Sequence, residues 1–501
     1  MTNLSLNLSE SARAHPDRPA IKFDDFVLSY REYDDATSRV ATMVRDRGIE
    51  PGDRVGLQLP NRPVFGLIYY GVLKAGGVVV PMNPLLKQRE VEYYLNDSGA
   101  KQLFSWHEMA EEAELGAKAA GVGFQAIAPE DFDRLMAENE PIAEPVARAD
   151  DDTAVILYTS GTTGKPKGAE LTHGSLNRNQ EVSARTLIKV SHEDVIMGCL
   201  PLFHVFGMTC GLNIAAARGA LLTLIPRFDP VKALDVIQRD KVTVFEGVPT
   251  MYAAMLGIPD HSSYDVSTLH TCVSGGAALP LEVLRGFEKE FGCIILEGYG
   301  LSETSPVASF NHPDRERKPG SIGTAIEGVE MRVVDDQGNE VAQGEIGEIQ
   351  IRGHNIMKGY WNNLEATAAS IGVDGWFSTG DMAKTDEDGY FYIVDRKKEL
   401  LIRGGYNVYP REVEEVLYEH PAVAEAAVVG IPHPSLGDEI GAAVALKAGA
   451  AATPEEIRDF VKERIAAYKY PRHVWLVDTL PKGPTGKILR REVKTPEGLE
   501  T

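Results

Sequence analysis

Residues 219–249, GALLTLIPRFDPVKALDVIQRDKVTVFEGVP, contain a complete strand–helix–strand pattern, and this pattern decides the expected fold. The runs GALLTLIP and VTVFEGVP are apolar and bounded by turn residues, which favours two strands. Between them, Asp229 can cap a helix, and Pro230 suits the first helical position because it has no N–H to lose there. The apolar residues of this helix are expected to face inward: Val231, Leu234, Val236 and Ile237. A strand–helix–strand unit connects parallel strands, so we expect the two strands to be parallel neighbours.

The same alternation of short strands and amphipathic helices continues outward over roughly the first 390 residues, as in a layered α/β sheet. The most apolar stretch, Val64–Met82, is interrupted by Lys74 and the pair Gly76–Gly77. It therefore predicts a buried helix that leads into a Val-Val-Val strand, and no transmembrane segment. We expect an α/β protein whose large N-terminal domain, residues 1–395, is built of layered β-sheets and helices.

The pattern changes near residue 395, where charged residues, glycines and aromatics become mixed. After this segment the sequence predicts a helix over 410–420, strands over 425–432 and 441–447, and a further helix. In that last helix, Thr453 and Glu456 form a capping box with Pro454 between them. Its expected apolar face consists of Ile457, Phe460, Val461 and Ile465. We therefore expect residues 396–501 to form a small, mobile C-terminal α+β domain on a polar hinge.

The composition excludes several classes of partner. The 501 residues include 51 Lys and Arg against 73 Asp and Glu, a net charge of −22, so nucleic acid and an anionic membrane surface are disfavoured as general partners. The four cysteines show no CxxC spacing and are expected to be scattered, reduced thiols: Cys199, Cys210, Cys272 and Cys293. The first residues show no secretory signal pattern, which favours a cytoplasmic protein.

The stretch YTSGTTGKPKG, Tyr158–Gly168, follows the apolar strand Ala154–Leu157 and has the composition of a phosphate-binding loop. Glycines allow tight turns that expose backbone N–H groups, hydroxyls add donors, and lysines add positive charge. Thr159 and Pro166 stand where a Walker A loop needs a glycine and a hydroxyl, so the loop is of another type. The alternative interpretation is a flexible surface turn. The candidate nucleotide-binding residues of the loop are Thr159, Ser160, Gly161, Thr162, Thr163, Gly164, Lys165 and Lys167.

Together with six later segments, this loop resembles the core motifs of the adenylate-forming superfamily of acyl-CoA synthetases, firefly luciferases and peptide-synthetase adenylation domains. Seven matches in the same order are far more specific than any one of them. EGYGLSETSPV is closest to fatty acyl-CoA ligases. The later segments are PLFHVFG (201–207), GGAAL (275–279), EGYGLSET (297–304), GWFSTGD (375–381), DRKKELLIRGGYNVYP (395–410) and PKGPTGK (481–487).

The resemblance implies an ATP site and assigns roles within it. Asp381 would hold the ribose hydroxyls with help from Arg396, Glu303 would bind Mg²⁺, and Thr304 would contact phosphate. A carboxylate suits both tasks, because it accepts hydroxyl donors and is a hard oxygen ligand. Ser302 departs from the usual threonine but keeps the hydroxyl. Tyr299 would stack on adenine, and the remaining residues of the nucleotide site would be Gly276, Ala277, Ala278, Glu297, Gly298 and Gly300.

The resemblance also implies a catalytic lysine and a hinge. Lys487 would bridge the α-phosphate and the substrate carboxylate, a role that suits a mobile point charge with three donors. Lys398 would be the hinge about which the small domain rotates once the adenylate has formed. Rotation would bring Gly404 and Gly405 beside the pantetheine arm of CoA. By sequence alone, a terminal lysine or a charged turn is usually solvated surface.

The substrate acid is expected to have an apolar tail. The resemblance places His204 at the mouth of the acyl pocket, where it would contact the substrate carboxyl group. Outside the nucleotide-site residues Ser302, Glu303 and Thr304, the rest of the expected lining is small or apolar apart from Glu246. No arginine lies between Glu297 and Thr304 to pair with a second carboxylate. A medium- or long-chain fatty acid fits this lining, while aryl acids such as coumarate remain open. The expected lining comprises residues 205–208, 245–252, 275–278 and 298–307.

We therefore predict an ATP-dependent fatty acyl-CoA ligase that uses Mg²⁺ and CoA and releases AMP and pyrophosphate. Other functions on the same motifs stay open: an aryl-CoA ligase, a luciferase-like oxygenase, an adenylation domain that loads a carrier protein, or a non-catalytic nucleotide-binding scaffold. The scaffold is disfavoured because the candidate residues Glu303, Asp381 and Lys487 are all present. The sequence leaves open both a monomer and a homodimer.

Overall fold

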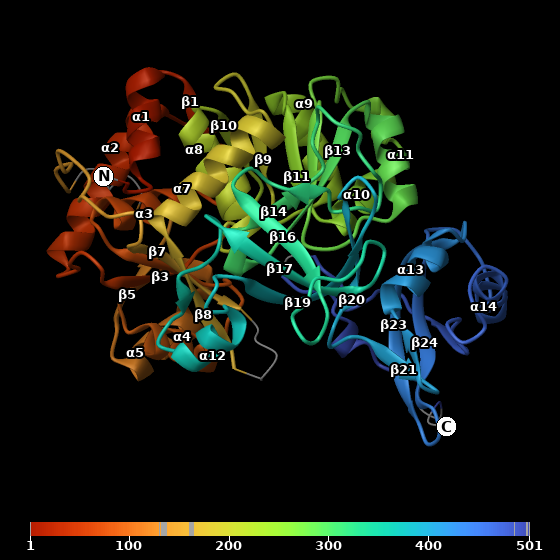
Figure 1. Cartoon of the computed structure of the whole chain (residues 1–501). Helices are drawn as coiled ribbons and strands as arrows, with labels where there is room; N and C mark the ends of the chain where they lie inside the picture. Colours follow the sequence, from red (N-terminus) through yellow and green to blue (C-terminus); the bar gives the residue numbers. More distant parts are fainter. Residues whose placement is uncertain are drawn as a thin grey trace.

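The computed structural model describes residues 2–129, 131, 138–159, 165–484, 486–496 and 499. Figure 1 shows a large N-terminal domain and a smaller C-terminal domain that projects from one side of it. This architecture confirms the expected α/β fold with a small C-terminal domain. In the described part of the chain, no helix is long and apolar enough to cross a bilayer.

Two sheets form the centre of the large domain. The nine-stranded sheet has the order β15 (Thr324–Ala325), β14 (Val307–Phe310), β13 (Ile294–Gly300), β12 (Thr271–Ser274), β11 (Val244–Gly247), β9 (Val195–Gly198), β10 (Leu221–Leu224), β1 (Pro19–Phe23) and β2 (Phe26–Ser29). The seven-stranded sheet has the order β18 (Gly359–Tyr360), β8 (Lys167–Thr172), β7 (Thr153–Thr159), β4 (Val78–Pro81), β3 (Arg54–Gln58), β5 (Ala100–Trp106) and β6 (Gly123–Ile127).

Helices cover these sheets (Figure 1). They are α1 (Leu6–Ala14), α2 (Tyr30–Asp46), α3 (Pro63–Lys74), α4 (Gln88–Ser98), α5 (Ala110–Ala120), α7 (His173–Val182), α8 (Ile214–Arg218), α9 (Pro230–Asp240), α10 (Pro249–Leu256), α11 (Leu281–Phe291) and α12 (Leu364–Ser370). Two π-helical segments, η2 (Ser183–Leu187) and η3 (Gly207–Asn213), continue α7 and precede α8 respectively.

Two smaller sheets complete the fold. A four-stranded antiparallel sheet contains β16 (Val329–Val334), β17 (Gly347–Gly353), β19 (Phe377–Thr385) and β20 (Phe391–Arg396). The C-terminal domain contains a five-stranded sheet of β22 (Tyr406–Val408), β21 (Leu401–Arg403), β24 (Gly437–Leu446), β23 (Val423–His433) and β25 (His473–Leu476). Helices α13 (Pro410–Tyr418) and α14 (Pro454–Lys462) pack beside this sheet, and the short 3-10 helix η6 (Arg490–Glu492) follows Lys487.

The strand–helix–strand unit at 219–249 forms β10, α9 and β11, with one difference from the expectation. Asp229 caps α9 by accepting the Lys232 N–H at 2.9 Å. The two strands are parallel, but β9 lies between them, so they are not neighbours. The chain enters β9 before β10, and only the packing of the whole sheet determines that order.

One residue of α9 also differs from the expectation. Leu234, Val236 and Ile237 are fully buried, but Val231 is 42% exposed. At 3.6 residues per turn, Val231 points about 120° around the helix from Ile237, so it leaves the buried face.

Other local predictions are confirmed. The stretch from Val64 forms the buried helix α3, followed by β4. In the C-terminal domain, Thr453 and Glu456 form the reciprocal capping box at 3.2 and 2.8 Å. Ile457 and Val461 are buried in the core of this domain, and Phe460 and Ile465 pack against it.

The expectation of four scattered cysteines is wrong for one pair. All four are buried and free. The sulfur atoms of Cys272 and Cys293 nevertheless lie 3.5 Å apart. Cys272 lies on β12 and Cys293 comes directly before its parallel neighbour β13, so residues far apart in sequence meet in space.

Candidate active site

A cavity of about 220 Å³ lies between the two domains. The ends of β12 and β13 and the start of α10 form one wall, and β19, β20 and α13 form another. Many of the residues that the sequence motifs identified line this cavity together. They are Gly276, Ala277, Ala278, Glu297, Gly298, Tyr299, Gly300, Asp381, Arg396 and Lys487.

Asp381 is held in place by two side chains at one end of the cavity. Its carboxylate accepts a hydrogen bond from the Tyr299 hydroxyl at 2.5 Å. It also forms an ion pair with Arg396, whose Nε lies 3.0 Å away. Asp381 and Arg396 are cross-strand partners on β19 and β20. The charge of Asp381 raises the pKa of Arg396, while burial and then Asp381 raise the pKa of Tyr299 well above its usual value. A buried carboxylate with fixed neighbours can accept the two hydroxyls of a ribose.

Glu303 forms a second polar centre, where the phosphate-binding loop begins and ends. Its Oε1 accepts the Tyr360 hydroxyl at 2.9 Å and lies 3.4 Å from the Thr159 hydroxyl. Lys167 is paired with Thr159 across β7 and β8, and its amine lies 5.0 Å from the centre of the Tyr360 ring. A carboxylate beside a lysine and hydroxyls can interact with phosphates and a divalent cation.

Of the other residues predicted for the phosphate-binding loop, the structure describes only Lys165. Lys165 is exposed, and its phosphate contact stays a prediction. The predicted residues Ser160, Gly161, Thr162, Thr163 and Gly164 lie outside the described residues.

Thr304 is buried directly after Glu303. Its hydroxyl accepts a hydrogen bond from the Leu301 N–H at 2.8 Å and donates one to the Pro306 carbonyl. The hydroxyl therefore acts as both acceptor and donor within the turn. The arrangement fixes the turn that carries Glu303, and a phosphate contact by Thr304 stays a prediction.

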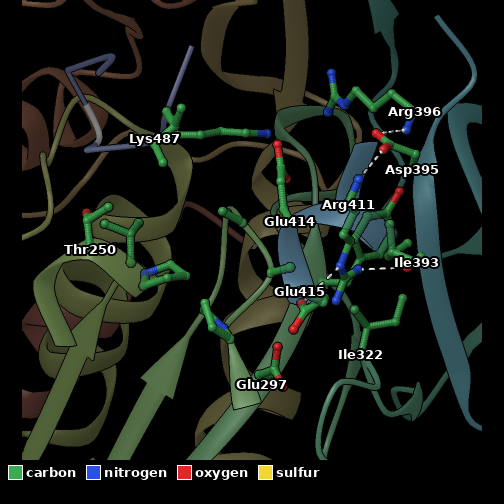
Figure 2. Close-up of a pocket in the computed structure, with 18 of the residues that line it drawn as sticks. Thr250, Glu297, Ile322, Ile393, Asp395, Arg396, Arg411, Glu414, Glu415 and Lys487 are labelled. Carbon is green, nitrogen blue, oxygen red and sulfur yellow. Dashed lines mark hydrogen bonds and ion pairs between the residues drawn. The ribbon is translucent and has the colours of Figure 1, made fainter. Parts of the chain in front are cut away.

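Glu297 lies at the base of the cavity on β13, below Arg411 and Glu415 of α13 (Figure 2). It accepts backbone N–H groups from Leu279 at 3.2 Å and Gly320 at 3.3 Å. Burial raises the pKa of Glu297 to about 7, against the opposing charge of Arg411. The carboxyl group is therefore about half protonated near neutral pH.

Lys487 extends from the C-terminal segment into the cavity (Figure 2). The Thr250 hydroxyl donates to the Gly486 carbonyl at 3.1 Å and thereby attaches this segment to the large domain. Although part of the Lys487 side chain is exposed, the surrounding walls lower its pKa, and so does the charge of Arg396. An amine that meets another cation in a narrow cavity provides a binding place for an anion.

His204 lies close to Lys487, three residues before η3 begins. Burial and, to a smaller extent, the charge of Lys487 lower the pKa of His204 to about 4. The imidazole is therefore neutral at pH 7, and its Nδ1 accepts the Phe206 N–H at 3.3 Å. The Nε2–H is then the donor that this side chain can offer to a ligand.

Arg490 holds the C-terminal segment, a feature that the motifs did not reveal. Its guanidinium group pairs with Glu414 at 2.8 and 2.6 Å, with Asp395 at 2.9 Å, and with Glu399. Burial by itself would lower the pKa of Arg490, but these carboxylates raise it. The run ILRRE was visible after Lys487, but the sequence contains no signal that Arg490, and not Arg491, would turn inward.

Lys398, Gly404 and Gly405 are not among the described residues that line the cavity, although Arg396 and Glu399 on either side of Lys398 do line it. Lys398 is exposed in the turn after β20. Gly404 and Gly405 form the turn between β21 and β22 with positive φ angles of 58° and 84°. The structure does not bring these three residues to Lys487, so their predicted roles in hinge motion and CoA binding stay predictions.

Comparisons with known proteins agree with this site. The family described as "AMP-binding enzyme" matches residues 8–361, and "AMP-binding enzyme C-terminal domain" matches residues 412–487. The chain is 39% identical to a long-chain-fatty-acid–CoA ligase of Bacillus subtilis (strain 168), over 97% of this chain and 93% of that protein. It is 38% identical to a feruloyl-CoA synthase of Amycolatopsis sp, over 96% of each.

Among solved structures, ATP-bound MatB from Rhodopseudomonas palustris superimposes with a TM-score of 0.90 at 32% identity, over 98% of this chain and 97% of that one. Its bound nucleotide agrees with a nucleotide site in the shared fold. The chain therefore belongs to the AMP-binding enzyme family, within the adenylate-forming superfamily and close to the fatty acyl-CoA ligases, and is an AMP-forming acid–thiol ligase that uses ATP and CoA.

Proposed function

We propose that the protein activates a medium- or long-chain fatty acid as an acyl-adenylate and then transfers the acyl group to CoA. One observation supports this most directly: Lys487, attached through Gly486 to Thr250, shares a cavity with the pair of Asp381 and Tyr299. In this arrangement an amine lies near the expected position of the α-phosphate when the ribose is bound by Asp381.

In the first step, a carboxylate oxygen of the acid attacks the α-phosphorus of ATP. The bond to the bridging oxygen breaks, and pyrophosphate leaves with the electron pair. Negative charge accumulates on the α-phosphate oxygens in the transition state, and Lys487 stabilises it by donating hydrogen bonds. His204, neutral and with Nε2–H free to donate, orients the carboxyl group.

Mg²⁺ fits the residues beside the phosphate-binding loop. Magnesium is commonly bound by one or two carboxylates together with substrate phosphates, so a single Glu303 is a suitable protein ligand. Among the described residues, no cluster of three or more His, Cys, Asp or Glu could hold a metal without the nucleotide. When bound, the ion neutralises charge on the departing pyrophosphate, while Thr159 and Lys167 contact the phosphates.

In the second step, the CoA thiol attacks the acyl carbon of the adenylate, and AMP leaves. We propose that the small domain rotates about Lys398 and brings the turn of Gly404 and Gly405 to the site in place of Lys487. The two steps need different groups beside the acyl-adenylate. The first step needs a cation near the α-phosphate, and the second needs a narrow path through which the CoA thiol can reach the acyl carbon. Glycines allow the close backbone approach that such a path requires.

The fatty acid is the preferred substrate on the evidence of the long-chain relative and of the apolar residues around the expected pocket. An aryl acid is the second candidate, because the feruloyl-CoA synthase is almost as similar to this chain. A dicarboxylate is disfavoured, since no arginine lies between Glu297 and Thr304 to pair with a second carboxylate. We further propose a cytoplasmic location.

CoA-dependent release of AMP tests the proposal. Purified protein with ATP, Mg²⁺ and CoA is supplied with saturated acids from hexanoate to palmitate and with 4-coumarate. We expect the highest kcat/KM for an aliphatic acid. A large preference for coumarate would transfer the assignment to the aryl-CoA ligases, and no AMP release with any acid would refute a ligase function.

A further inference from the structure

Glu246 is a buried carboxyl group that the proposed reaction does not use. It lies on β11, is 1% exposed, and its Oε1 has no hydrogen-bond partner among the described residues. Burial raises its pKa well above the usual value, which favours the protonated form of the side chain. A neutral carboxyl group can donate one hydrogen bond and accept others.

Glu246 packs against the π-helix η3. A Cβ atom added to Gly211 of this helix would lie 3.4 Å from Oε2 of Glu246, so the glycine leaves the carboxyl group beside bare backbone. Cys210, on the same helix, has its pKa raised by burial and then by Glu246. The carboxyl group therefore lies between η3 and the sheet strands β9 and β11, which η3 contacts. π-Helical segments are frequent at functional sites.

The helix η3 connects Glu246 to the catalytic cavity. His204, close to Lys487, comes just before this helix, and the Phe206 ring lies against Gly275, next to the cavity residue Gly276. On the strand side, Val248 lines the cavity two residues after Glu246. The path from His204 to Gly211 covers seven residues, on the order of 10 Å of helix. Glu246 thus lies within residues 245–252, which are expected to line the acyl pocket, and two residues before the cavity residue Val248.

An acyl tail made only of methylene groups would leave this carboxyl group unsatisfied. A buried polar group without a partner is unfavourable, and a ligand group that hydrogen-bonds to it would remove this cost. Thr209 on η3 also carries a buried hydroxyl with no partner among the described residues. A negatively charged tail group would find no cation beside Glu246 in these contacts, whereas a hydroxyl could both donate to it and accept from it.

We propose that Glu246 is a specificity-determining residue that hydrogen-bonds a hydroxyl group on the tail of the substrate. The preferred acids would then be hydroxylated carboxylic acids, with an aliphatic or an aromatic tail. This inference rests on the proposed ligase function and adds a chemical class to its substrate.

The test compares acids that differ only by a hydroxyl group. The pairs are octanoate with 8-hydroxyoctanoate, and cinnamate with 4-hydroxycinnamate, measured as kcat/KM for CoA-dependent AMP release. We expect the wild-type enzyme to prefer the hydroxylated member of at least one pair by about tenfold, which corresponds to about 1.4 kcal/mol. The pair that shows the preference identifies an aliphatic or an aromatic source of the hydroxyl.

Three variants separate the role of Glu246 from a general effect. Glu246→Met, similar in size but without hydrogen-bonding oxygens, should lower the ratio of kcat/KM for the hydroxylated acid to that for the unsubstituted acid to about one. Glu246→Gln should retain most of the preference. Glu282→Met, on the exposed face of α11, is the matched control and should behave like the wild type.

The outcomes distinguish this inference from the ligase function. If no acid releases AMP, the ligase function fails. If unsubstituted acids are used as well as or better than their hydroxylated partners in both pairs, the role of Glu246 fails and the ligase stands. An unchanged preference in a folded Glu246→Met enzyme also refutes it. If Glu246→Met does not fold, the test rests on the kcat/KM ratios of the wild-type enzyme and of Glu246→Gln. Loss of the preference for the hydroxylated acid in a folded Glu246→Gln enzyme then counts against the proposal.

Discussion

Replacing Glu297 by glutamine should make the stability of the large domain less sensitive to pH. Glu297 is 5% exposed, and burial moves its pKa from 4.5 to about 7 in the native state. In the unfolded chain the side chain is hydrated and loses its proton near the lower value. Between these two pH values the native protein therefore binds a proton that the unfolded chain has already released.

This difference sets the sign and the size of the effect. Stability conferred by the protonated Glu297 is fully present below pH 4.5 and is lost as the pH rises to about 7. Because one pKa unit corresponds to 1.36 kcal/mol, the complete loss is about 3 kcal/mol. Between pH 5.5 and 8.0 the same relation gives about 2 kcal/mol, since the unfolded chain is already largely ionised at pH 5.5. Glutamine does not titrate, so the Glu297→Gln variant should not lose this stability.

Urea unfolding of the full chain at pH 5.5 and 8.0 measures the effect. The free energy of unfolding of Glu297→Gln minus that of the wild type should increase by about 2 kcal/mol from the lower to the higher pH. Glu282→Gln, an exposed glutamate on α11, provides the control and should show no such increase. A difference that stays constant with pH, or that is larger at pH 5.5, would refute the assignment of a raised pKa to Glu297.

Three further predictions concern the catalytic steps. Lys487→Ala should lower the rate of ATP–pyrophosphate exchange by about 10²–10³-fold, because a transition-state donor is removed, and near-normal exchange would contradict its role. Lys398→Pro should leave this exchange intact and slow thioester formation from the adenylate, since a stiffened turn restricts rotation; equal loss in both assays would argue against a hinge. Arg490→Ala should reduce the exchange rate by about tenfold by displacing Lys487, whereas Arg491→Ala, whose side chain is 71% exposed, should not; equal effects of the two variants would show that the Arg490 ion pairs do not position the lysine.

Much of the site was predictable because its residues occur in short, ordered motifs. Tyr299, Asp381, Arg396 and Lys487 all meet in one cavity, as their motifs indicated. The sequence marks Glu246 as a polar exception in an apolar lining. That its Oε1 has no hydrogen-bond partner among the described residues depends on which residues η3 brings against it. Contacts of this kind join segments far apart in the chain, and no local pattern encodes them.

The sequence by itself determined the features that depend on neighbouring residues: the caps of α9 and α14, the buried helix α3, the change to a small C-terminal domain and the family motifs. These arise from backbone hydrogen bonds and apolar periodicity within a few residues. Only the tertiary structure decided that β9 separates β10 from β11, that Cys272 meets Cys293, and that Arg490 points inward to three carboxylates. Strand order and buried ion pairs minimise the free energy of the whole molecule, so they become defined only when distant segments pack together.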